Sequence, residues 1–218
     1  MKNTLLAGVV ILAVGVAGCS SSSESKQTAT ANGGGTTGDG MVYQKHKHIQ
    51  KVWLAPGFDF TGYDTLLIDE TKYTAKERPN EVEIRNWAIG YLRTALGERI
   101  KTNQVFANVV TSQGDVKPGA KVLRMENTIY EYEKGGGGAR YFAGLYGAGQ
   151  PVLKVRGQFA DAEKTLCRFE ASRSGESVGA RMVGAFLSDR DIQQNDINDL
   201  AVDFSEFVGR TARHLATK

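Results

Sequence analysis

The chain has 218 residues, and 27 Lys and Arg against 24 Asp and Glu give it a formal net charge of +3. This near balance excludes the strongly basic surface of a nucleic-acid-binding protein, so we expect no nucleic-acid partner. The chain has two cysteines, Cys19 and Cys167. If Cys19 is modified, Cys167 has no partner for an internal disulfide, and the fold must rest on its hydrophobic core.

Residues 1–18 have the order of a secretory signal peptide. Lys2 precedes an apolar run from Leu5 to Val16, and small residues follow. The run covers about 12 residues, whereas a transmembrane helix needs about 20. We therefore expect this segment to be a cleaved signal, and a permanent membrane-spanning helix is the weaker alternative.

The segment Val16-Ala17-Gly18-Cys19 resembles the lipobox of bacterial lipoproteins. This resemblance implies cleavage before Cys19 and acylation of that residue, which would anchor the chain in a membrane. The alternative is an ordinary signal peptide that happens to contain a cysteine. Ser20 resembles the residue found in lipoproteins sorted to the outer membrane. For a Gram-negative source we therefore expect an outer-membrane lipoprotein that faces the periplasm.

Residues 19–40 form the acylated cysteine and a flexible tether in this interpretation. From Ser20 to Gly40 the chain is almost wholly Ser, Thr, Gly and Ala with a few charges, so it cannot bury a core. A coil of this kind spans about 25 Å on average. Residues 41–218 then have the size and apolar content of a single globular domain.

The hydrophobic pattern of this domain predicts strands and two helices. Asn80 and Glu83 resemble a capping box at the start of the first helix. Both helices have one apolar face, which must cover a sheet. The sequence thus predicts an α+β two-layer sandwich, with a mixed, mainly antiparallel sheet and two main helices, and leaves open whether the helices share a face. We expect strands over residues 65–68, 105–110, 121–132, 152–161 and 165–172, and helices over residues 81–101 and 198–215.

Three segments carry a resemblance to a known family. They are Tyr63 to Ile68, the aromatic and glycine-rich run from Ala139 to Gly149, and Ala160-Asp161-Ala162 at the end of a strand. Together they resemble the DUF4410 family of bacterial lipoproteins from about Phe58 to the C-terminus. Glu163-Lys164 replace the Thr-Gly pair that usually follows in that family. The resemblance implies an envelope location and a rough fold, but no activity, because this family is a domain of unknown function.

The loop between the two long strands is the strongest candidate for a contact surface. Four glycines, 135–138, lead into it, but the lack of a following helix and of a Lys-Ser/Thr pair argues against nucleotide binding. Large apolar side chains on a glycine-rich loop need to be covered by the domain's own core, by a partner protein or by the bilayer. The candidate interaction residues are Tyr141, Phe142, Leu145 and Tyr146.

The other polar clusters have simple structural explanations. The basic segment 45–48 is expected to be solvated, since its two histidines lack the further ligands of a metal site. Four Asp residues between 189 and 199 suit the start of a helix better than a calcium loop. Cys167 is expected to face inward from a strand, and His214 has no partners for a catalytic triad. We therefore expect no metal, no cofactor and no enzymatic activity.

Two hypotheses for the function follow from these features. The first is a non-enzymatic, membrane-anchored envelope protein whose domain binds another protein in the periplasm. The second is a carrier or sensor that holds a small apolar ligand or lipid between its sheet and its helices.

Overall fold

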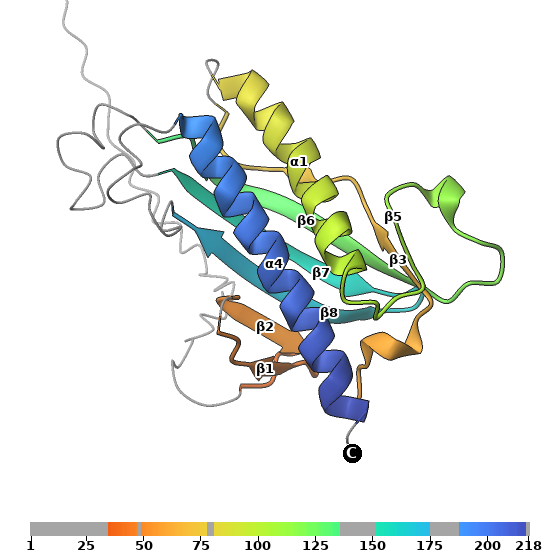
Figure 1. Cartoon of the computed structure of the whole chain (residues 1–218). Coiled ribbons are helices and arrows are strands. Elements are labelled where there is room, and N and C mark those ends of the chain that lie inside the picture. Colours follow the sequence, from red (N-terminus) through yellow and green to blue (C-terminus); the bar gives the residue numbers. More distant parts are fainter. Residues whose placement is uncertain (1–34, 48, 78–80, 136–150, 175–187, 217–218) are drawn as a thin grey trace, which may run out of the picture. The chain divides into compact units, whose positions relative to one another are not determined.

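The computed structural model describes residues 35–47, 49–77, 81–135, 151–174 and 188–216 (Figure 1). Their strands form one eight-stranded mixed sheet in the order β1-β2-β8-β7-β6-β3-β5, and β4 also pairs with β6. The strands are β1 Val42–Gln44, β2 Lys51–Leu54, β3 Thr65–Ile68, β4 Lys72–Tyr73, β5 Asn108–Val110, β6 Val122–Glu133, β7 Val152–Ala160 and β8 Thr165–Arg173.

The sheet combines antiparallel and parallel pairing. The pairs β1–β2, β2–β8, β8–β7 and β7–β6 are antiparallel. The strands β3 and β4 run parallel to β6, and β5 runs parallel to β3. The predicted α+β class with a mixed sheet is therefore confirmed.

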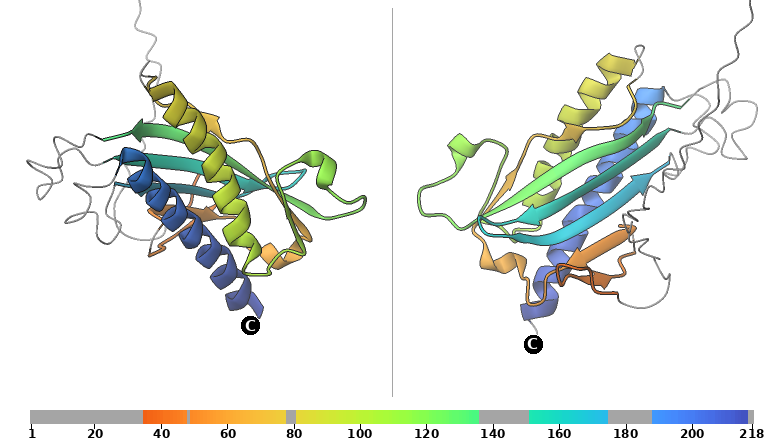
Figure 2. Two further views of the ribbon diagram at one scale, coloured as in Figure 1. Left: turned by 45° about the horizontal axis from the view of Figure 1, so that its top comes forward. Right: turned by 180° about the vertical axis from the view of Figure 1, so that it is seen from behind.

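The two long helices, α1 (Val82–Lys101) and α4 (Asp189–Ala216), lie side by side on the same face of the sheet (Figures 1 and 2). On α1, Trp87 and Tyr91 are half-buried and stack on each other with 5.2 Å between ring centroids. The Tyr91 hydroxyl donates a hydrogen bond of 2.9 Å to Asn198 Oδ1 of α4. These two aromatic side chains therefore contribute to the contact between the helices.

Phenylalanine rings fill the space between the sheet and the helices. Phe169 of β8 meets Phe204 of α4 with 4.5 Å between ring centroids. Phe60, in the short 3-10 helix η1 (Phe60–Gly62), lies 5.2 Å from Phe159 and 5.6 Å from Phe207. Four of these rings, those of Phe60, Phe159, Phe169 and Phe204, are almost completely buried. Because each buried aromatic side chain contributes about 1.5–3 kcal/mol of transfer free energy, this cluster is a major source of stability.

The last helix begins earlier than the sequence pattern predicts, at Asp189 rather than near Asn198. Ser188 Oγ accepts a hydrogen bond of 3.1 Å from the backbone N–H of Asp191, and Asp191 Oδ2 accepts bonds from the N–H and the hydroxyl of Ser188. This reciprocal pair is a capping box with Asp as the acidic member. The Asp residues that were expected ahead of the helix therefore lie within it.

Three further boundaries differ from the expectations. Helix α1 follows Glu81, whose side chain makes no capping hydrogen bond, and Asn80 lies outside the described residues. Strand β5 begins at Asn108 rather than at Val105, because the chain first turns at Gln104, whose φ is 57°. Residues 35–40, expected in the tether, join the fold: Thr36 bridges to Val42, and Tyr43 N–H donates to the Gly35 carbonyl.

Candidate functional site

The residues proposed from the sequence as sites lie outside the described part of the chain. This holds for the lipidation site Cys19 and for the loop residues Tyr141, Phe142, Leu145 and Tyr146. The nearest described residues, Gly135 and Pro151, follow β6 and precede β7. The loop thus connects the two strands that lie near the middle of the sheet.

The side of the sheet opposite α1 and α4 has no described element lying on it (Figure 2, right). We call this side the open face. Side chains alternate along β6, β7 and β8, so that residues such as Leu123, Val155 and Phe169 are buried under the helices while their neighbours point to the open face. The sheet therefore has one side covered by the helices and one open side.

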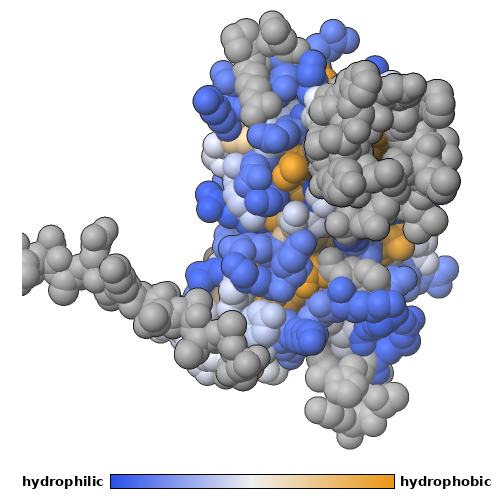
Figure 3. Space-filling model, turned by 90° about the vertical axis from the view of Figure 1, so that its left-hand side faces the viewer, coloured by the Kyte–Doolittle hydropathy of each residue, from blue (hydrophilic) through white to orange (hydrophobic). Residues whose placement is uncertain are grey.

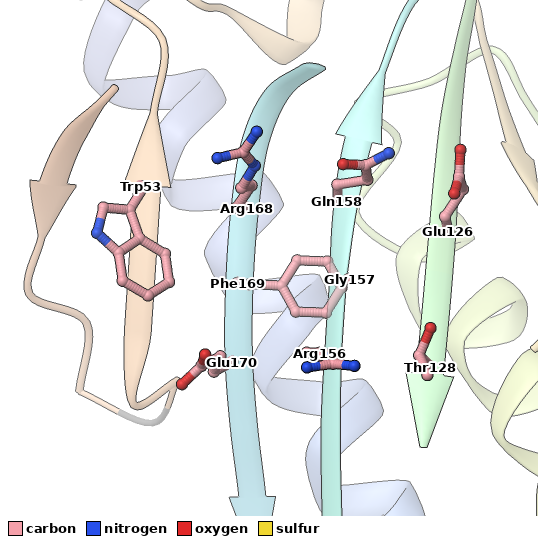
Figure 4. Close-up of a pocket in the computed structure, with 9 residues that line it drawn as sticks. All are labelled: Trp53, Glu126, Thr128, Arg156, Gly157, Gln158, Arg168, Phe169 and Glu170. Atoms are coloured by element: carbon pink, nitrogen blue, oxygen red, sulfur yellow. The ribbon is translucent and has the colours of Figure 1, made fainter. Parts of the chain in front are cut away.

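The strand register arranges the open face into two rows of side chains that cross the sheet (Figure 4). Each row takes one residue from each strand that it crosses, at directly paired positions. The first row is Lys72, Thr128, Arg156, Glu170 and Lys51. The second row is Glu126, Gln158, Arg168, Trp53 and Tyr43.

A shallow hollow of about 330 Å³ lies between these rows in the middle of the sheet. Gly157 and Phe169 lie between the two rows, as Figure 4 shows. Gly157 has no side chain, and a Cβ there would meet the Glu126 carbonyl oxygen and come within 2.6 Å of Phe169 Cζ. The glycine therefore lets the Phe169 ring pack across β7. The residues lining the hollow are Trp53, Glu126, Thr128, Arg156, Gly157, Gln158, Arg168, Phe169 and Glu170.

Most charges on the open face form ion pairs with one another. Lys51 Nζ lies 2.7 Å from Glu170 Oε2, and Lys154 Nζ lies 2.8 Å from Glu131 Oε2. These hydrogen-bonded carboxylates raise the pKa of both lysines above the ordinary value. The remaining pairs are Lys72–Glu126 at 3.6 Å, Arg124–Asp69 at 2.8 Å and Arg168–Asp39 at 2.7 Å.

Arg156 differs from these basic residues. No carboxylate pairs with it anywhere in the described ranges, and its guanidinium lies over the Tyr130 ring with 5.3 Å between Cζ and the ring centroid. At the other side of the face, Trp53 meets Tyr43 edge to face at 6.1 Å. Half-buried Trp53 and Tyr43 thus form the aromatic margin of a face whose centre is charged.

A second hollow, of about 660 Å³, lies at the end of the sheet where β7 turns into β8. Here Asp161 Oδ1 accepts hydrogen bonds from the backbone N–H groups of Glu163 and Lys164, and Asp161 Oδ2 accepts one of 2.9 Å from the Tyr63 hydroxyl. The backbone bond from Lys164 is the main cause that lowers the pKa of Asp161. Burial, followed by the bond to Asp161, raises the pKa of Tyr63 to about 12. Residues 161–164 thus form the turn between β7 and β8, and the Tyr63 hydroxyl group holds Asp161 in place.

The remaining candidates from the sequence have structural roles. Cys167 is completely buried in β8, as predicted, and burial raises the pKa of its thiol. His46, expected in a solvated segment, packs its ring 5.4 Å from Phe207 of α4, and its Nδ1 accepts a bond from Ile49 N–H. Within the described ranges, no group of three or more His, Cys, Asp or Glu side chains is placed to hold a metal ion.

The described surface is largely polar. Figure 3 views the side on the left of Figure 1, and its coloured residues are mostly hydrophilic, with apolar residues in small separate areas. No described helix combines the length and the apolar character needed to cross a bilayer.

Comparison with known proteins gives similar structures but no family. No family model and no curated protein matches the sequence, so the resemblance to DUF4410 is not confirmed. The chain is similar to PelC of Paraburkholderia phytofirmans, solved as a dodecamer, with 12% identity over 70% of this chain and 96% of that one, and a TM-score of 0.45. It is similar to the DUF330 protein XCC0632 of Xanthomonas campestris, with 8% identity over 76% and 94% and a TM-score of 0.43.

A minor lipoprotein of Acinetobacter baumannii is also similar, with 19% identity over 68% of this chain and 94% of that one, and a TM-score of 0.29. The structures that this chain is similar to therefore include a bacterial lipoprotein. Their identities and TM-scores are too low to assign a family or a function to the chain.

Proposed function

We propose that the chain is a bacterial lipoprotein of the DUF4410 type, anchored in the outer membrane through acylated Cys19, and that it binds a periplasmic protein without catalysing a reaction. The binding surface in this proposal is the open face of the sheet. The observation that carries this proposal is the pair of side-chain rows, each of which crosses five strands. Most of the charged side chains in these rows form ion pairs, and the second row ends with the aromatic pair Trp53 and Tyr43.

The dimensions of the open face suit a protein partner. From β1 to β6 the strands span about 20 Å, and the nine residues of β7 or β8 extend about 30 Å. The flat area covered by these strands is about 500–600 Å², and projecting side chains add to the accessible surface. This approaches the roughly 800 Å² of accessible surface that each partner contributes to a standard interface. The hollow at its centre is shallow and polar, which suits side chains of a partner better than a small apolar ligand.

The chemistry of the face also suits protein binding. Tyr, Trp and Arg are enriched in protein interfaces, and here Tyr43, Trp53 and Arg156 are all on one surface. The other basic groups of the face are already paired with carboxylates. A partner that covers them therefore does not bury an unpaired charge at these positions. The alternative role as an apolar-ligand carrier needs room between the layers, and the Phe60, Phe159, Phe169 and Phe204 rings occupy that space.

Site-specific photo-crosslinking in intact cells tests this function. Benzoylphenylalanine replaces Thr128, which lines the hollow, or Glu98, which is exposed on helix α1. We expect a discrete protein adduct from position 128 and a much weaker one, or none, from position 98. Equal adducts from both positions, or no adduct from position 128, would contradict binding through the open face. The predicted contact of the Tyr141–Tyr146 loop is tested in the same way from Tyr141.

A further inference from the structure

Arg156 lies near the centre of the open face and lacks an acidic partner among the residues that the structure describes. Lys51, Lys72, Arg124, Lys154 and Arg168 each pair with a carboxylate in the described structure, but Arg156 does not. Each of the five carboxylates involved is occupied in one of these pairs. Among these six basic side chains, the Arg156 guanidinium is the one whose charge no carboxylate of the described residues offsets.

A β-bulge places an aromatic ring beneath this guanidinium. The register of β6 with β7 shifts between Ile129 and Glu131, which leaves Tyr130 as the extra residue. Its ring lies under Arg156, with Cζ 5.3 Å from the centroid. Stacking of this kind restricts a long side chain without using its N–H donors, so less conformational entropy is lost when an acceptor binds.

The structure already holds one carboxylate from outside the sheet on a neighbouring arginine of this face. Asp39 lies in the turn before β1, and its Oδ2 is 2.7 Å from Nη1 of Arg168. Arg168 is on β8, next to β7, and in the row next to that of Arg156. The face thus accommodates a carboxylate that approaches from a separate segment and binds an arginine by charge-assisted hydrogen bonds.

We propose that Arg156 is the anchor point at which the partner protein places an Asp or Glu carboxylate. This inference rests on the proposed function and identifies the partner chemistry of the same face. A carboxylate complements the unpaired charge of Arg156, and a planar guanidinium binds it through two parallel hydrogen bonds. An anionic lipid surface fits less well, because carboxylates of the face, such as Glu126 and Glu170, would be pressed against it.

The test compares Arg156 variants in cells that carry the cross-linker at position 128. Arg156→Gln keeps length and polarity but removes the charge, and Arg156→Lys keeps the charge but not the paired donors. The matched control is Lys154→Gln, two residues along the same strand, whose lysine is already paired with Glu131. A contact at an interface centre is worth at least about 1.4 kcal/mol, which is about tenfold in affinity.

We expect Arg156→Gln to reduce the adduct at least about tenfold, Arg156→Lys to reduce it less, and Lys154→Gln to change it less than about twofold. The cross-linked partner peptide should contain an Asp or Glu close to the cross-link. Reversing that residue to Arg should restore the adduct of Arg156→Glu. Circular dichroism of the purified variants checks that the fold is intact.

The outcomes separate the two proposals. If the adduct forms but is unchanged in Arg156→Gln, or if charge reversal fails to restore it, the role of Arg156 is wrong while protein binding by the open face stands. If only lipid adducts form, or none, the proposed function itself fails, and the role of Arg156 fails with it.

Discussion

Gly157 shows how one residue shapes both faces of the sheet. It lies opposite Asn127 in β6, on the side covered by the helices, where Phe169 needs room for its ring. The open face above it has the hollow that Gly157 and Phe169 help to line. Conformational freedom is not the reason for this glycine, because its φ is not positive. Close packing requires it.

We predict that Gly157→Ala lowers the free energy of unfolding by about 3 kcal/mol, because overpacking forces both the ring and the backbone of β6 to move. Urea denaturation of the purified variant measures this. The matched control is Gly90→Ala in α1, where a Cβ meets nothing within 4 Å and should add about 0.5–1 kcal/mol. Equal stability of Gly157→Ala and the wild type would show that the packing argument is wrong.

Tyr63 and Asp161 illustrate what the family resemblance contributes. They belong to two of the three segments that carry it, and they are 98 residues apart in sequence. The structure joins them by one hydrogen bond, which holds the β7–β8 turn against the loop before β3. The structural contact thus gives a reason for the presence of Tyr63 and Asp161 in these two segments, and the two residues need no catalytic role to explain them.

The pH dependence of stability tests this contact. The pKa of Tyr63 is raised from 10.0 to about 12 in the folded chain, so its stabilising effect is complete below pH 10 and is lost as the pH rises through about 12. We predict that Tyr63→Phe costs about 1 kcal/mol at pH 8 and that this difference from the wild type shrinks towards pH 12. Thermal melts of both proteins measure it. A difference that stays constant with pH would contradict the raised pKa.

At the scale of elements, strongly periodic segments were predicted well and short or locally capped ones were not. The buried strand β3 and the long strands β6, β7 and β8 match their expected ranges within one or two residues. Strands β1, β2 and β4 were not predicted, because two to four residues show too little alternation. Their pairing partners, β8 and β6, define them.

The start of α4 was missed for a different reason. Its first turns are polar, and an apolar stripe is visible only from Leu200 onward, so periodicity alone placed the start too late. The local signal was present as Ser188-Asp189-Arg190-Asp191, which has the spacing of a capping box. Capping by Ser188 satisfies backbone N–H groups that the polar first turns leave without a partner.

We predict that Ser188→Ala lowers the free energy of unfolding by about 1 kcal/mol, because the Asp191 N–H loses its acceptor. Chemical denaturation followed by circular dichroism measures the change. Gln194→Ala, at an exposed position of the same helix, is the control and should change stability by less than about 0.5 kcal/mol. If the two variants behave alike, the capping box does not stabilise the helix.

At the scale of the whole molecule, the fold class followed from the sequence but the candidate binding face did not. In β7, Val155 and Phe159 alternate with polar neighbours, a pattern typical of a sheet with one solvated side. The two rows could not be foreseen, because they combine residues from strands whose order and register are set only by folding. The unpaired state of Arg156 is likewise visible only when the partners of all its neighbours are known.

The proposed anchor and the proposed binding face are close to each other in sequence. The described chain begins at Gly35, beside β1, and Asp39 next to it reaches the open face at Arg168. Gly35 follows Cys19 by 16 positions, so the proposed anchor is close in sequence to the β1 edge and to the aromatic margin.

We predict that Cys19→Ala abolishes labelling by a palmitate analogue in cells and shifts the protein away from the outer-membrane fraction, because no acyl chain then binds the bilayer. Cys167→Ala provides the matched control, since its thiol is buried in β8 and should not be acylated. If Cys19→Ala keeps the label, or if Cys167→Ala loses it, the anchor has been assigned to the wrong residue.

If the anchor concentrates the domain at its partner, the cross-link from position 128 should weaken in Cys19→Ala even though the open face is unchanged. An adduct of undiminished yield would mean that the open face finds its partner without the membrane, and that anchoring and binding are separate properties of the chain.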